Sequence, residues 1–432
     1  MIGIVLFLLL VVSEVVFLFL QIFQKSSLQK KKAFLPLAEL LLFVVLLLAG
    51  VILFSFRWFL LLVFLIVRGS FAVITLMRKR QERSYRLSGT IGRFAGSVLL
   101  ILLVCLPALI FPQYKPLTLS GSYTLATASY TWTDESRVET FEEDGSKRQV
   151  TVQFWYPDID TEEKFPLVVF SHGAFGFRMS NYSTFAELAS NGYVVCSIDH
   201  PYHAFFTKQT DGKVITVNQT FLQEAMNINE SDSTEDYIFS TTQEWLKLRT
   251  DDMNFVIDTI EQLTEASEED EVFQHTDLTK IGVMGHSLGG ATSVAIGRQR
   301  KDVDAVIDID GSMLGEELSY QNGKYQLNQE AYPLPLLAID STDHYQEGLS
   351  YGDQYANNVT LANALDGREV HFDHAGHLNF TDLPFFSPTL AGMLGTGNID
   401  RTYCIKTMND VILKYYNHYL KGAGQLSLKE VY

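Results

Sequence analysis

The 432-residue chain contains only three cysteines, and they are scattered. Cys105 lies inside an apolar run, Cys196 inside a predicted strand and Cys404 near a predicted C-terminal helix. Three isolated cysteines form neither a metal-binding pattern nor a disulfide framework. We therefore interpret them as small, buried apolar side chains.

Positive charge is scarce outside the N-terminal quarter. Residues 1–112 hold 12 of the 33 basic and 3 of the 50 acidic residues, so the remainder holds 21 basic and 47 acidic ones. This acidic part has no basic patch, which argues against nucleic acid as a partner. In the first part, the basic residues lie mostly in short loops between apolar runs, and this arrangement indicates a membrane.

Four apolar runs in residues 1–112 predict transmembrane helices. About 20 residues are needed to cross the ~30 Å hydrocarbon core of a bilayer. The first run is too long for a cleaved signal peptide, and no small-residue cleavage site follows it. The four runs are Ile2–Phe23, Phe34–Phe54, Trp58–Met77 and Phe94–Phe111.

Positive charges in the short loops predict the orientation of these spans. One cluster, Lys25 and Lys30–Lys32, follows the first run, and a second cluster separates the third run from the fourth. Four spans place both clusters in the cytoplasm, with the N-terminus and all residues after Phe111 outside. The second cluster consists of Arg78, Lys79, Arg80, Arg83, Arg86 and Arg93.

Three ionisable residues interrupt the apolar runs. Glu14 and Arg68 lie near the middle of their runs, so they could pair across the helix bundle, and Glu39 lies in the second run. Charged groups at such positions usually face the interior of a bundle. We interpret all three as packing or interface residues.

From Tyr114 onward, strand-like and helix-like patterns alternate. "YTLATASYTW" and "RQVTVQFWYPD" predict early antiparallel strands, and five later short apolar runs predict parallel strands buried on both faces. Helical patterns cover 180–190, 237–263 and 289–298, and Thr207–Glu235 is interpreted as a surface insertion. We predict an α/β fold with a mostly parallel sheet over residues 113–432, preceded by a helical membrane domain over 1–112.

One serine, Ser287, lies between glycines in "KIGVMGHSLGGATSVAIG". A serine hydroxyl becomes a nucleophile when a base takes its proton and a sharp turn holds it clear of its own backbone. Gly285 and Gly289 leave room for such a turn, which gives the G-x-S-x-G pattern between a strand and a helix. This context predicts a catalytic serine rather than a simple glycine-rich turn.

An acyl-transfer serine needs a histidine base, which follows late in the chain in this kind of fold. "REVHFDHAGHLNF" offers three candidates. His377 follows Ala375-Gly376 in a predicted loop and is preferred, His374 is second, and His371 lies in a strand-like portion. The His-x-x-His-x-x-His spacing could indicate a metal, but no matching ligand cluster exists elsewhere, so we predict none.

Two residues compete for the acid that orients the histidine. Asp310 ends the strand "AVIDID", and Asp343 lies in the loop just past the next predicted strand. Asp340, at the end of that strand, and Asp308, deeper in its own, are weaker candidates. For the oxyanion hole we predict the backbone N–H groups of Leu288, after the nucleophile, and of Ala174, in "FSHGAFGF".

These motifs resemble those of the α/β-hydrolase family of plasma/type II platelet-activating-factor acetylhydrolases. The resemblance extends from about Phe165 to Phe386, in "FSHGAFGFR", "GHSLGGAT", "DIDGSMLG" and "GHLNFTDLPFF". In that family the acid lies in an Asp-x-x-Met motif, which favours Asp310 over Asp343, and the histidine precedes x-Asn-Phe-x-Asp, which favours His377. The four-span N-terminal unit is not part of the family pattern.

The resemblance implies a metal- and cofactor-independent serine esterase that forms an acyl-enzyme on short-acyl or lipid-like carboxylic esters. Alternatives are a general carboxylesterase or polyesterase, a peptidase, or a non-catalytic sensor domain on a membrane module. The bilayer and an ester or phospholipid-like substrate are the predicted partners.

Glycosylation sequons bear on the predicted location. One of them, at Asn379, lies two residues from His377, where a glycan would obstruct the proposed site. With scant cysteine, this favours a multi-pass protein of a bacterial cell membrane, with an extracytoplasmic catalytic domain. The sequons begin at Asn181, Asn218, Asn229, Asn358 and Asn379.

Overall fold

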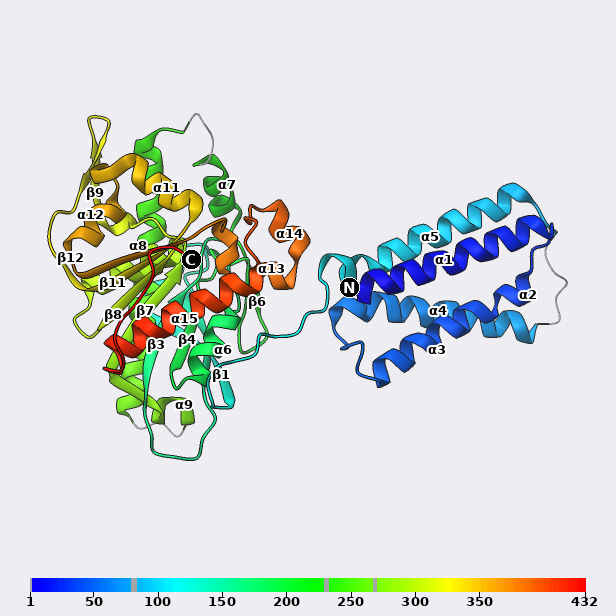
Figure 1. Cartoon of the computed structure of the whole chain (residues 1–432), viewed down its shortest axis with the longest axis horizontal. Coiled ribbons are helices and arrows are strands. Elements are labelled where there is room, and N and C mark those ends of the chain that lie inside the picture. Colours follow the sequence, from blue (N-terminus) through cyan, green and yellow to red (C-terminus); the bar gives the residue numbers. More distant parts are fainter. Residues whose placement is uncertain (1, 79–83, 229–232, 267–269) are drawn as a thin grey trace. The chain divides into compact units, whose positions relative to one another are not determined.

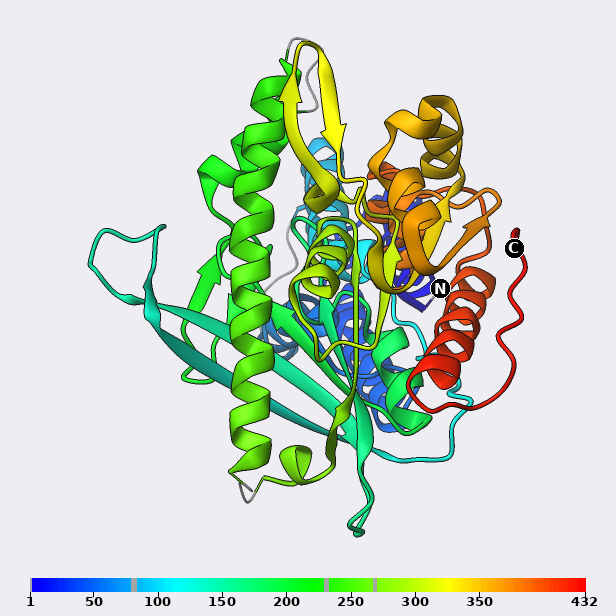
Figure 2. The same cartoon turned by 90° about the vertical axis from the view of Figure 1, so that its left-hand side faces the viewer.

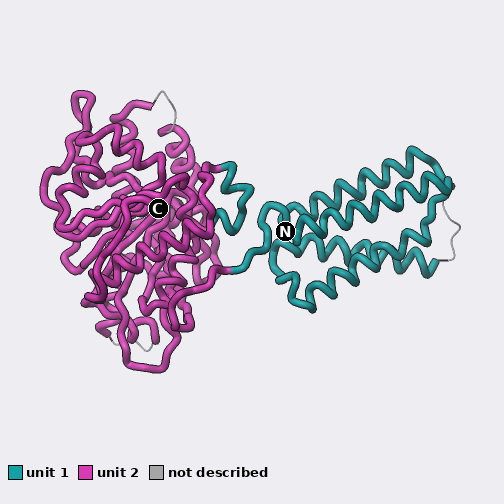
Figure 3. The backbone as a smooth tube through the Cα atoms, viewed as in Figure 1, with its two compact units in different colours: residues 1–115, 383–393 teal, residues 116–382, 394–432 magenta. Residues whose placement is uncertain are grey.

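The computed structural model describes residues 2–78, 84–228, 233–266 and 270–432. These residues form two compact units (Figure 3). Unit 1 comprises 1–115 and 383–393, and unit 2 comprises 116–382 and 394–432. The predicted basic residues Lys79, Arg80 and Arg83 and the sequon at Asn229 lie outside the described ranges.

Unit 1 is a bundle of apolar helices (Figure 1). α1 packs along α5, α3 along α4, and α4 along α5. Three of these helices, α1, α4 and α5, are long and apolar enough to cross a membrane. The helices are α1 (Ile2–Phe23), α2 (Gln29–Lys32), α3 (Phe34–Leu48), α4 (Phe56–Met77), α5 (Leu87–Ile110), α13 (Leu383–Phe386) and α14 (Pro388–Met393).

The second predicted span is shorter than its apolar run. Helix α3 has 15 residues and ends at Leu48, whereas the run continues to Phe54. Gly50 has a φ of 68°, its amide donates to the Leu47 carbonyl, and the Val51 amide donates to Leu46. These two bonds close a helix end that glycine adopts without steric strain, so the apolar run stops being helical there.

Charged side chains lie inside the unit 1 bundle. The Glu14 carboxylate is fully buried and pairs with Arg68 at 2.6 Å and with Lys32 at 2.5 Å. Arg68 also lies 3.3 Å from Glu39, and the Ser97 hydroxyl donates to Glu14. The predicted Glu14–Arg68 pair is therefore confirmed, and the network joins α1, α3, α4 and α5.

Residues 383–393 belong to unit 1 although they lie late in the chain. The Phe386 ring lies 5.0 Å from the Phe111 ring and 6.2 Å from the Phe56 ring. The Ser387 hydroxyl donates to the Ile110 carbonyl at the end of α5. Aromatic packing and this bond tie the segment to the ends of α4 and α5.

Unit 2 is built on an eight-stranded sheet in the order β1-β2-β4-β3-β7-β8-β11-β12. β1 pairs with β2, and β2 with β4, in antiparallel register, and every later pair is parallel. The mostly parallel sheet is as predicted. The strands are β1 (Leu125–Val138), β2 (Lys147–Pro157), β3 (Phe165–Ser171), β4 (Val194–Asp199), β7 (Thr276–His286), β8 (Ala305–Ile309), β11 (Tyr332–Ser341) and β12 (Ala364–Phe372).

Helices cover both faces of this sheet, and in Figure 2 the long green α8 and the red α15 lie on opposite sides of the strands. α10 packs on α8 and on the central strands, and α15 packs on α6. Successive strand residues point to opposite faces, and because both faces are covered, the central strands are mostly apolar on both sides. The helices are α6 (Tyr182–Ser190), α7 (Gln219–Asn227), α8 (Glu235–Glu265), α9 (Glu271–Gln274), α10 (Leu288–Gln299), α11 (Thr342–Tyr351), α12 (Ala356–Asn363) and α15 (Arg401–Tyr419).

Several short elements lie outside the eight-stranded sheet. The predicted insertion 207–235 contains a small hairpin and α7, whose N-terminus is capped by the Asn218 side chain. Two further strands form a second hairpin before β11. These elements are β5 (Phe206–Lys208), β6 (Val214–Thr216), β9 (Glu317–Gln321), β10 (Lys324–Leu327), and the 3₁₀ turns Leu314–Glu316, Gly352–Gln354 and His377–Phe380.

Candidate active site

Ser287 lies at the turn between β7 and α10, where the sequence predicts it. Its backbone is strained, with φ 57° and ψ −125°, a conformation that costs a non-glycine residue of order 1–3 kcal/mol. A Cβ at Gly285 would lie 2.1 Å from the Gly289 carbonyl oxygen, and one at Gly289 would lie 1.9 Å from the Ser171 oxygen. Both flanking glycines are therefore sterically required.

Asp310 follows β8, the strand next to β7 in the sheet, and also has a positive φ, 55°. Its carboxylate is buried, and the Ser341 amide donates to Oδ1 at 2.5 Å. Burial alone would raise the pKa of Asp310, but the interactions with His344 and His377 outweigh it and hold this pKa well below its ordinary value. The residue is therefore ionised at neutral pH.

The structure brings His377 to Asp310. Its Nδ1 lies 2.6 Å from Asp310 Oδ2, so Nε2 lies on the opposite edge of a ring that is 44% exposed. The loop that carries it is held by the Asn379 side chain, which accepts hydrogen bonds from the Gly376 and Gly397 amides. Among the described residues, no hydrogen bond joins the Ser287 hydroxyl to His377; such bonds are often long in ligand-free sites.

The neighbouring His286 supports the same loop. Its ring lies 4.5 Å from the His377 ring, and its Nε2–H donates to the His377 carbonyl at 3.0 Å. Burial, with a smaller contribution from His377, lowers the pKa of His286 to about 3. His286 is therefore neutral at pH 7 and fixes the backbone of the histidine loop.

The two predicted oxyanion donors flank Ser287. A Cβ on Gly173, just before Ala174, would lie 3.1 Å from the Ser287 Cβ, so this loop passes directly over the serine. Leu288 is the first residue of α10, where backbone N–H groups favour negative charge. Among the described residues, neither the Ala174 nor the Leu288 amide donates a hydrogen bond to another protein group.

The other sequence candidates lie elsewhere. Asp343 is exposed in the first turn of α11, and Asp308 is wholly buried within β8. His371 lies in β12 with its ring stacked 3.8 Å from the Tyr345 ring, and His374 is an exposed turn residue with φ 65°. Among the described residues, none of these four forms a hydrogen bond, ion pair or ring contact with His377.

A buried arginine that the sequence did not single out supports the loop that carries Ala174. Arg249, on α8, is completely buried, and its guanidinium donates to the His172 carbonyl at 2.7 Å and to His203 Nδ1 at 3.3 Å. Burial, opposed by Asp252, lowers the pKa of Arg249 to about 9. Arg249 therefore remains charged at pH 7 and anchors the residues that precede Gly173.

Beneath this loop, Ser171, His200 and Asp252 form a hydrogen-bonded chain. The Ser171 hydroxyl lies 2.9 Å from His200 Nε2, and His200 Nδ1 lies 3.0 Å from Asp252. All three side chains are fully buried, so no substrate can reach this second serine–histidine–aspartate arrangement. We interpret it as a structural support for β3 and β4.

A second histidine, His344, contacts Asp310 and was also missed. Its Nδ1 lies 3.3 Å from Asp310 Oδ1 and 3.2 Å from Asp340 Oδ1. The only sequence signal was its position four residues after Asp340, one helical turn away if a helix starts there. It directly follows Asp343, the aspartate that sequence reasoning weighed instead.

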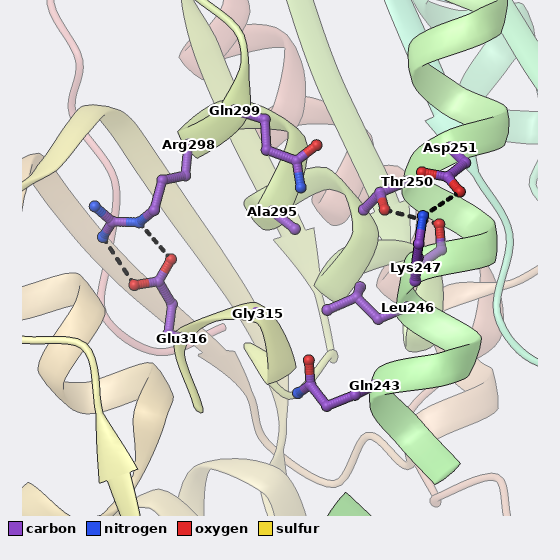
Figure 4. A pocket seen from close by; sticks show the side chains of 10 residues that line it. All are labelled: Gln243, Leu246, Lys247, Thr250, Asp251, Ala295, Arg298, Gln299, Gly315 and Glu316. Carbon is purple, nitrogen blue, oxygen red and sulfur yellow. Dashed lines mark hydrogen bonds and ion pairs between the residues drawn. The ribbon is translucent and has the colours of Figure 1, made fainter. Parts of the chain in front are cut away.

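A cavity of about 330 Å³ lies between α8, α10 and the turn Leu314–Glu316 (Figure 4). Arg298 and Glu316 form a two-point ion pair on one wall, and Lys247 pairs with Asp251 on the other. Ser287, Asp310 and His377 are not among its lining residues. Its charged groups already satisfy one another, so we assign no ligand to it.

A mostly parallel sheet, with a strained serine turn between a central strand and the helix that follows it, defines the α/β-hydrolase fold. A ferulic acid esterase from Streptomyces cinnamoneus has a similar structure, with a TM-score of 0.54 over 71% of this chain and 93% of the esterase. At 20% sequence identity, this likeness concerns the fold alone.

Sequence comparison is more specific. Residues 145–425 match the family described as platelet-activating factor acetylhydrolase, isoform II, and the chain belongs to this family. It is 24% identical over 287 residues to the platelet-activating factor acetylhydrolase of Canis lupus familiaris and 25% identical over 286 residues to that of Gallus gallus. These alignments cover 62% and 60% of this chain, which spans only 60% and 63% of the two relatives.

Proposed function

We propose that the chain is a membrane-anchored serine ester hydrolase that acts through an acyl-enzyme on short-acyl or lipid-like carboxylic esters. Membership of the acetylhydrolase family supports ester hydrolysis. The observation that carries the proposal is the 2.6 Å hydrogen bond between His377 and Asp310, beside a serine at a strained strand-to-helix turn. These are the parts that acyl transfer requires.

In the proposed acylation, Ser287 Oγ attacks the ester carbonyl while His377 Nε2 takes the hydroxyl proton. Asp310 accepts the Nδ1–H bond, keeps Nε2 as the basic nitrogen and stabilises the imidazolium. The amides of Ala174 and Leu288 donate to the oxygen on which negative charge develops. The tetrahedral intermediate then breaks its bond to the alcohol, which leaves with the proton from His377.

Deacylation repeats these steps with water. His377 takes a proton from water as the water oxygen attacks the acyl carbonyl, and the same two amides stabilise the oxyanion. The bond to Ser287 Oγ breaks, the serine recovers its proton from His377, and the carboxylic acid leaves. Apart from the ester and water, the proton transfers use only groups of the chain.

We further propose that unit 1 crosses the membrane four times and places unit 2 outside the cytoplasm. The Gln113 side chain accepts from the Leu53 amide and donates to the Val51 carbonyl, so the α3–α4 turn lies at the same end of the bundle as the chain after α5. At 1.5 Å per residue α3 spans about 22 Å, and the apolar residues 49–54 would complete this crossing.

Two sequons bear on the proposed bacterial location. Asn379 and Asn181 are each only 2% exposed. The Asn379 side chain accepts two backbone hydrogen bonds, and the Asn181 side chain donates to the Phe380 carbonyl. Neither side chain can carry a glycan without disrupting the site, which supports synthesis outside a glycosylating secretory route.

The test is labelling with a fluorophosphonate probe, followed by rates on nitrophenyl esters of increasing acyl length and on short-acyl phospholipids. We expect labelling that Ser287→Ala removes, with rates that fall as the acyl chain lengthens. Equal rates on long and short esters would favour a general carboxylesterase, and activity confined to amide substrates would favour a peptidase. Absence of labelling in the wild type would favour the alternative that unit 2 is a non-catalytic sensor domain.

A further inference from the structure

The acid of the proposed triad has two histidine partners, one on each carboxylate oxygen. His377 lies 2.6 Å from Asp310 Oδ2, and His344 lies 3.3 Å from Oδ1. The two rings come from different elements, the turn His377–Phe380 and helix α11. The acyl-transfer mechanism uses His377 and leaves His344 without a role.

His344 lies between two buried carboxylates. Its Nδ1 is 3.2 Å from Asp340 Oδ1 as well as 3.3 Å from Asp310 Oδ1, and its Nε2 contacts the Tyr355 hydroxyl. The side chains of Asp310 and Asp340 are only 2% and 6% exposed. Two carboxylates so close in a dry environment repel each other unless a positive charge lies between them.

The surrounding groups are almost all acidic. Burial, and next the charge of Asp340, raise the pKa of Glu369 to about 7. Burial opposes a charge on His344, yet the carboxylates of Asp310 and Asp340 outweigh it and raise the pKa of His344 far above its ordinary value. The titratable groups that face His344 are Asp308 and Asp310 from the β8 region, Asp340 from β11, Tyr355 before α12 and Glu369 from β12.

We propose that His344 is a positioning residue for the triad: as an imidazolium between Asp310 and Asp340, it keeps Asp310 ionised and directs Oδ2 toward His377. With Oδ1 held by His344 and by the Ser341 amide, rotation of the carboxylate is blocked.

This inference rests on the proposed hydrolase function and predicts a specific pH effect. Removing the positive charge raises the pKa of Asp310. The carboxylate that holds His377 Nδ1 is then protonated at a higher pH, so less of the protein is active at low pH. In His344→Gln we expect the acidic limb of the kcat/KM profile to move upward by about one pH unit or more. The rate at pH 6 should fall ~10-fold or more, with a smaller loss at pH 8.

The experiment measures kcat/KM for a soluble nitrophenyl acetate ester from pH 5 to 9 on the full chain. His371→Gln is the matched control, because His371 packs on Tyr345 of the same helix but does not contact Asp310, and its profile should match the wild type. Should His344→Gln not fold, the double variant Asp340→Asn/His344→Gln removes the Asp340 carboxylate together with its partner, so Asp340 is not left as an uncompensated buried charge. It should still show the upward shift.

A folded His344 variant with the wild-type pH profile would overturn the proposal. So would loss of activity on EDTA treatment with recovery on adding Zn²⁺, because Asp310, Asp340 and His344 would then hold a metal rather than a proton. A wild type that hydrolyses no ester, whether or not the fluorophosphonate probe labels it, would instead refute the proposed function. In that case, NMR signals of the ring nitrogens in ¹⁵N-histidine-labelled wild type test separately whether His344 stays doubly protonated at pH 8.

Discussion

The two units bury opposite kinds of side chain. In unit 1, Phe19 and Phe23 on α1 are 66% and 90% exposed, whereas Glu14 on the same helix has no exposed surface. In unit 2, by contrast, the apolar side chains lie inside, and strand residues such as Val283 and Ile307 are fully buried. The contrast supports the proposal that hydrocarbon surrounds the outer face of unit 1 and that unit 2 lies in water.

Both units nevertheless contain a buried charge cluster. In unit 1, Glu14 and Glu39 share Arg68, and in unit 2, Asp310 and Asp340 share His344. Each pair of carboxylates is compensated by a cation between them, as a dry environment demands. The clusters differ in what lies beside them, because only the second adjoins a histidine and a strained serine turn. We therefore propose that the cluster of unit 2 serves the chemistry and that the cluster of unit 1 serves the assembly of its helices.

The largest effect should follow from Ser287→Ala, which removes the nucleophile. We expect kcat to fall by ~10³-fold or more, because proton transfer and acyl transfer both need the hydroxyl. Ester hydrolysis and fluorophosphonate labelling of purified protein check this result. Ser240→Ala, at an exposed position on α8, is the control, and hydrolysis that survives in Ser287→Ala would place the nucleophile elsewhere.

Asp310→Asn should be nearly as damaging, by ~10²- to 10⁴-fold in kcat, because the amide favours the wrong tautomer of His377. Asp343→Asn should change kcat less than twofold, since Asp343 is exposed and does not contact His377. The measurement is steady-state kinetics on a nitrophenyl ester. A large loss in Asp343→Asn with full activity in Asp310→Asn would reverse the assignment of the acid.

Arg68→Gln tests the cluster of unit 1. Leaving Glu14 and Glu39 with one fewer cation should destabilise the bundle by ~3 kcal/mol, seen as a lower Tm in detergent, while kcat/KM on a soluble ester stays within twofold. Glu14→Gln/Arg68→Gln should recover part of the loss. The exposed Arg78, changed to Gln, is the control. If Arg68→Gln lost as much soluble-ester activity as Asp310→Asn, the proposed separation of chemistry in unit 2 from assembly in unit 1 would be contradicted.

The smallest effect concerns a buried carboxyl of unit 2 that is bound by the Ser183 amide, Asp382. Burial raises the pKa of Asp382 to about 6 from the ordinary 3.8, so its stabilising contribution is present below pH ~4 and is lost as the pH rises through about 6. Relative to wild type, Asp382→Asn should therefore gain stability as the pH rises from 4 to 8, by about 1–3 kcal/mol.

Thermal unfolding across that pH range measures this difference in stability. Asp158→Asn, in an exposed loop after β2, provides the comparison. A difference between Asp382→Asn and wild type that stays constant with pH would show that Asp382 does not titrate as inferred.

Sequence reasoning succeeded where a local pattern determines the geometry. The buried strands are continuous apolar runs, and the turn at Ser287 needs glycine at 285 and 289 because a Cβ at either would lie about 2 Å from a carbonyl oxygen. The spans of α1 and α8 were predicted to within a few residues for the same reason, since helical periodicity and apolar length are local properties.

It failed where long-range contacts decide. The end of α3 at Leu48 is a local exception: it depends on the hydrogen bonds around Gly50, which the apolar character of residues 49–54 concealed. The sequence predicts residues 383–393 as part of the α/β domain, whereas contacts with Phe56, Ile110 and Phe111 place them in unit 1. His344 and Arg249 became visible only because folding brought them to Asp310 and to the His172 carbonyl, 34 and 77 residues away in sequence.

The most direct measurement is the mass of the chain quenched during turnover of nitrophenyl acetate, followed by peptide mapping. One added acetyl group on the peptide that contains Ser287, formed and lost at the rate of turnover, is the predicted result. Turnover with no acylated peptide, or with the acyl group on another residue, would contradict an acyl-enzyme at Ser287.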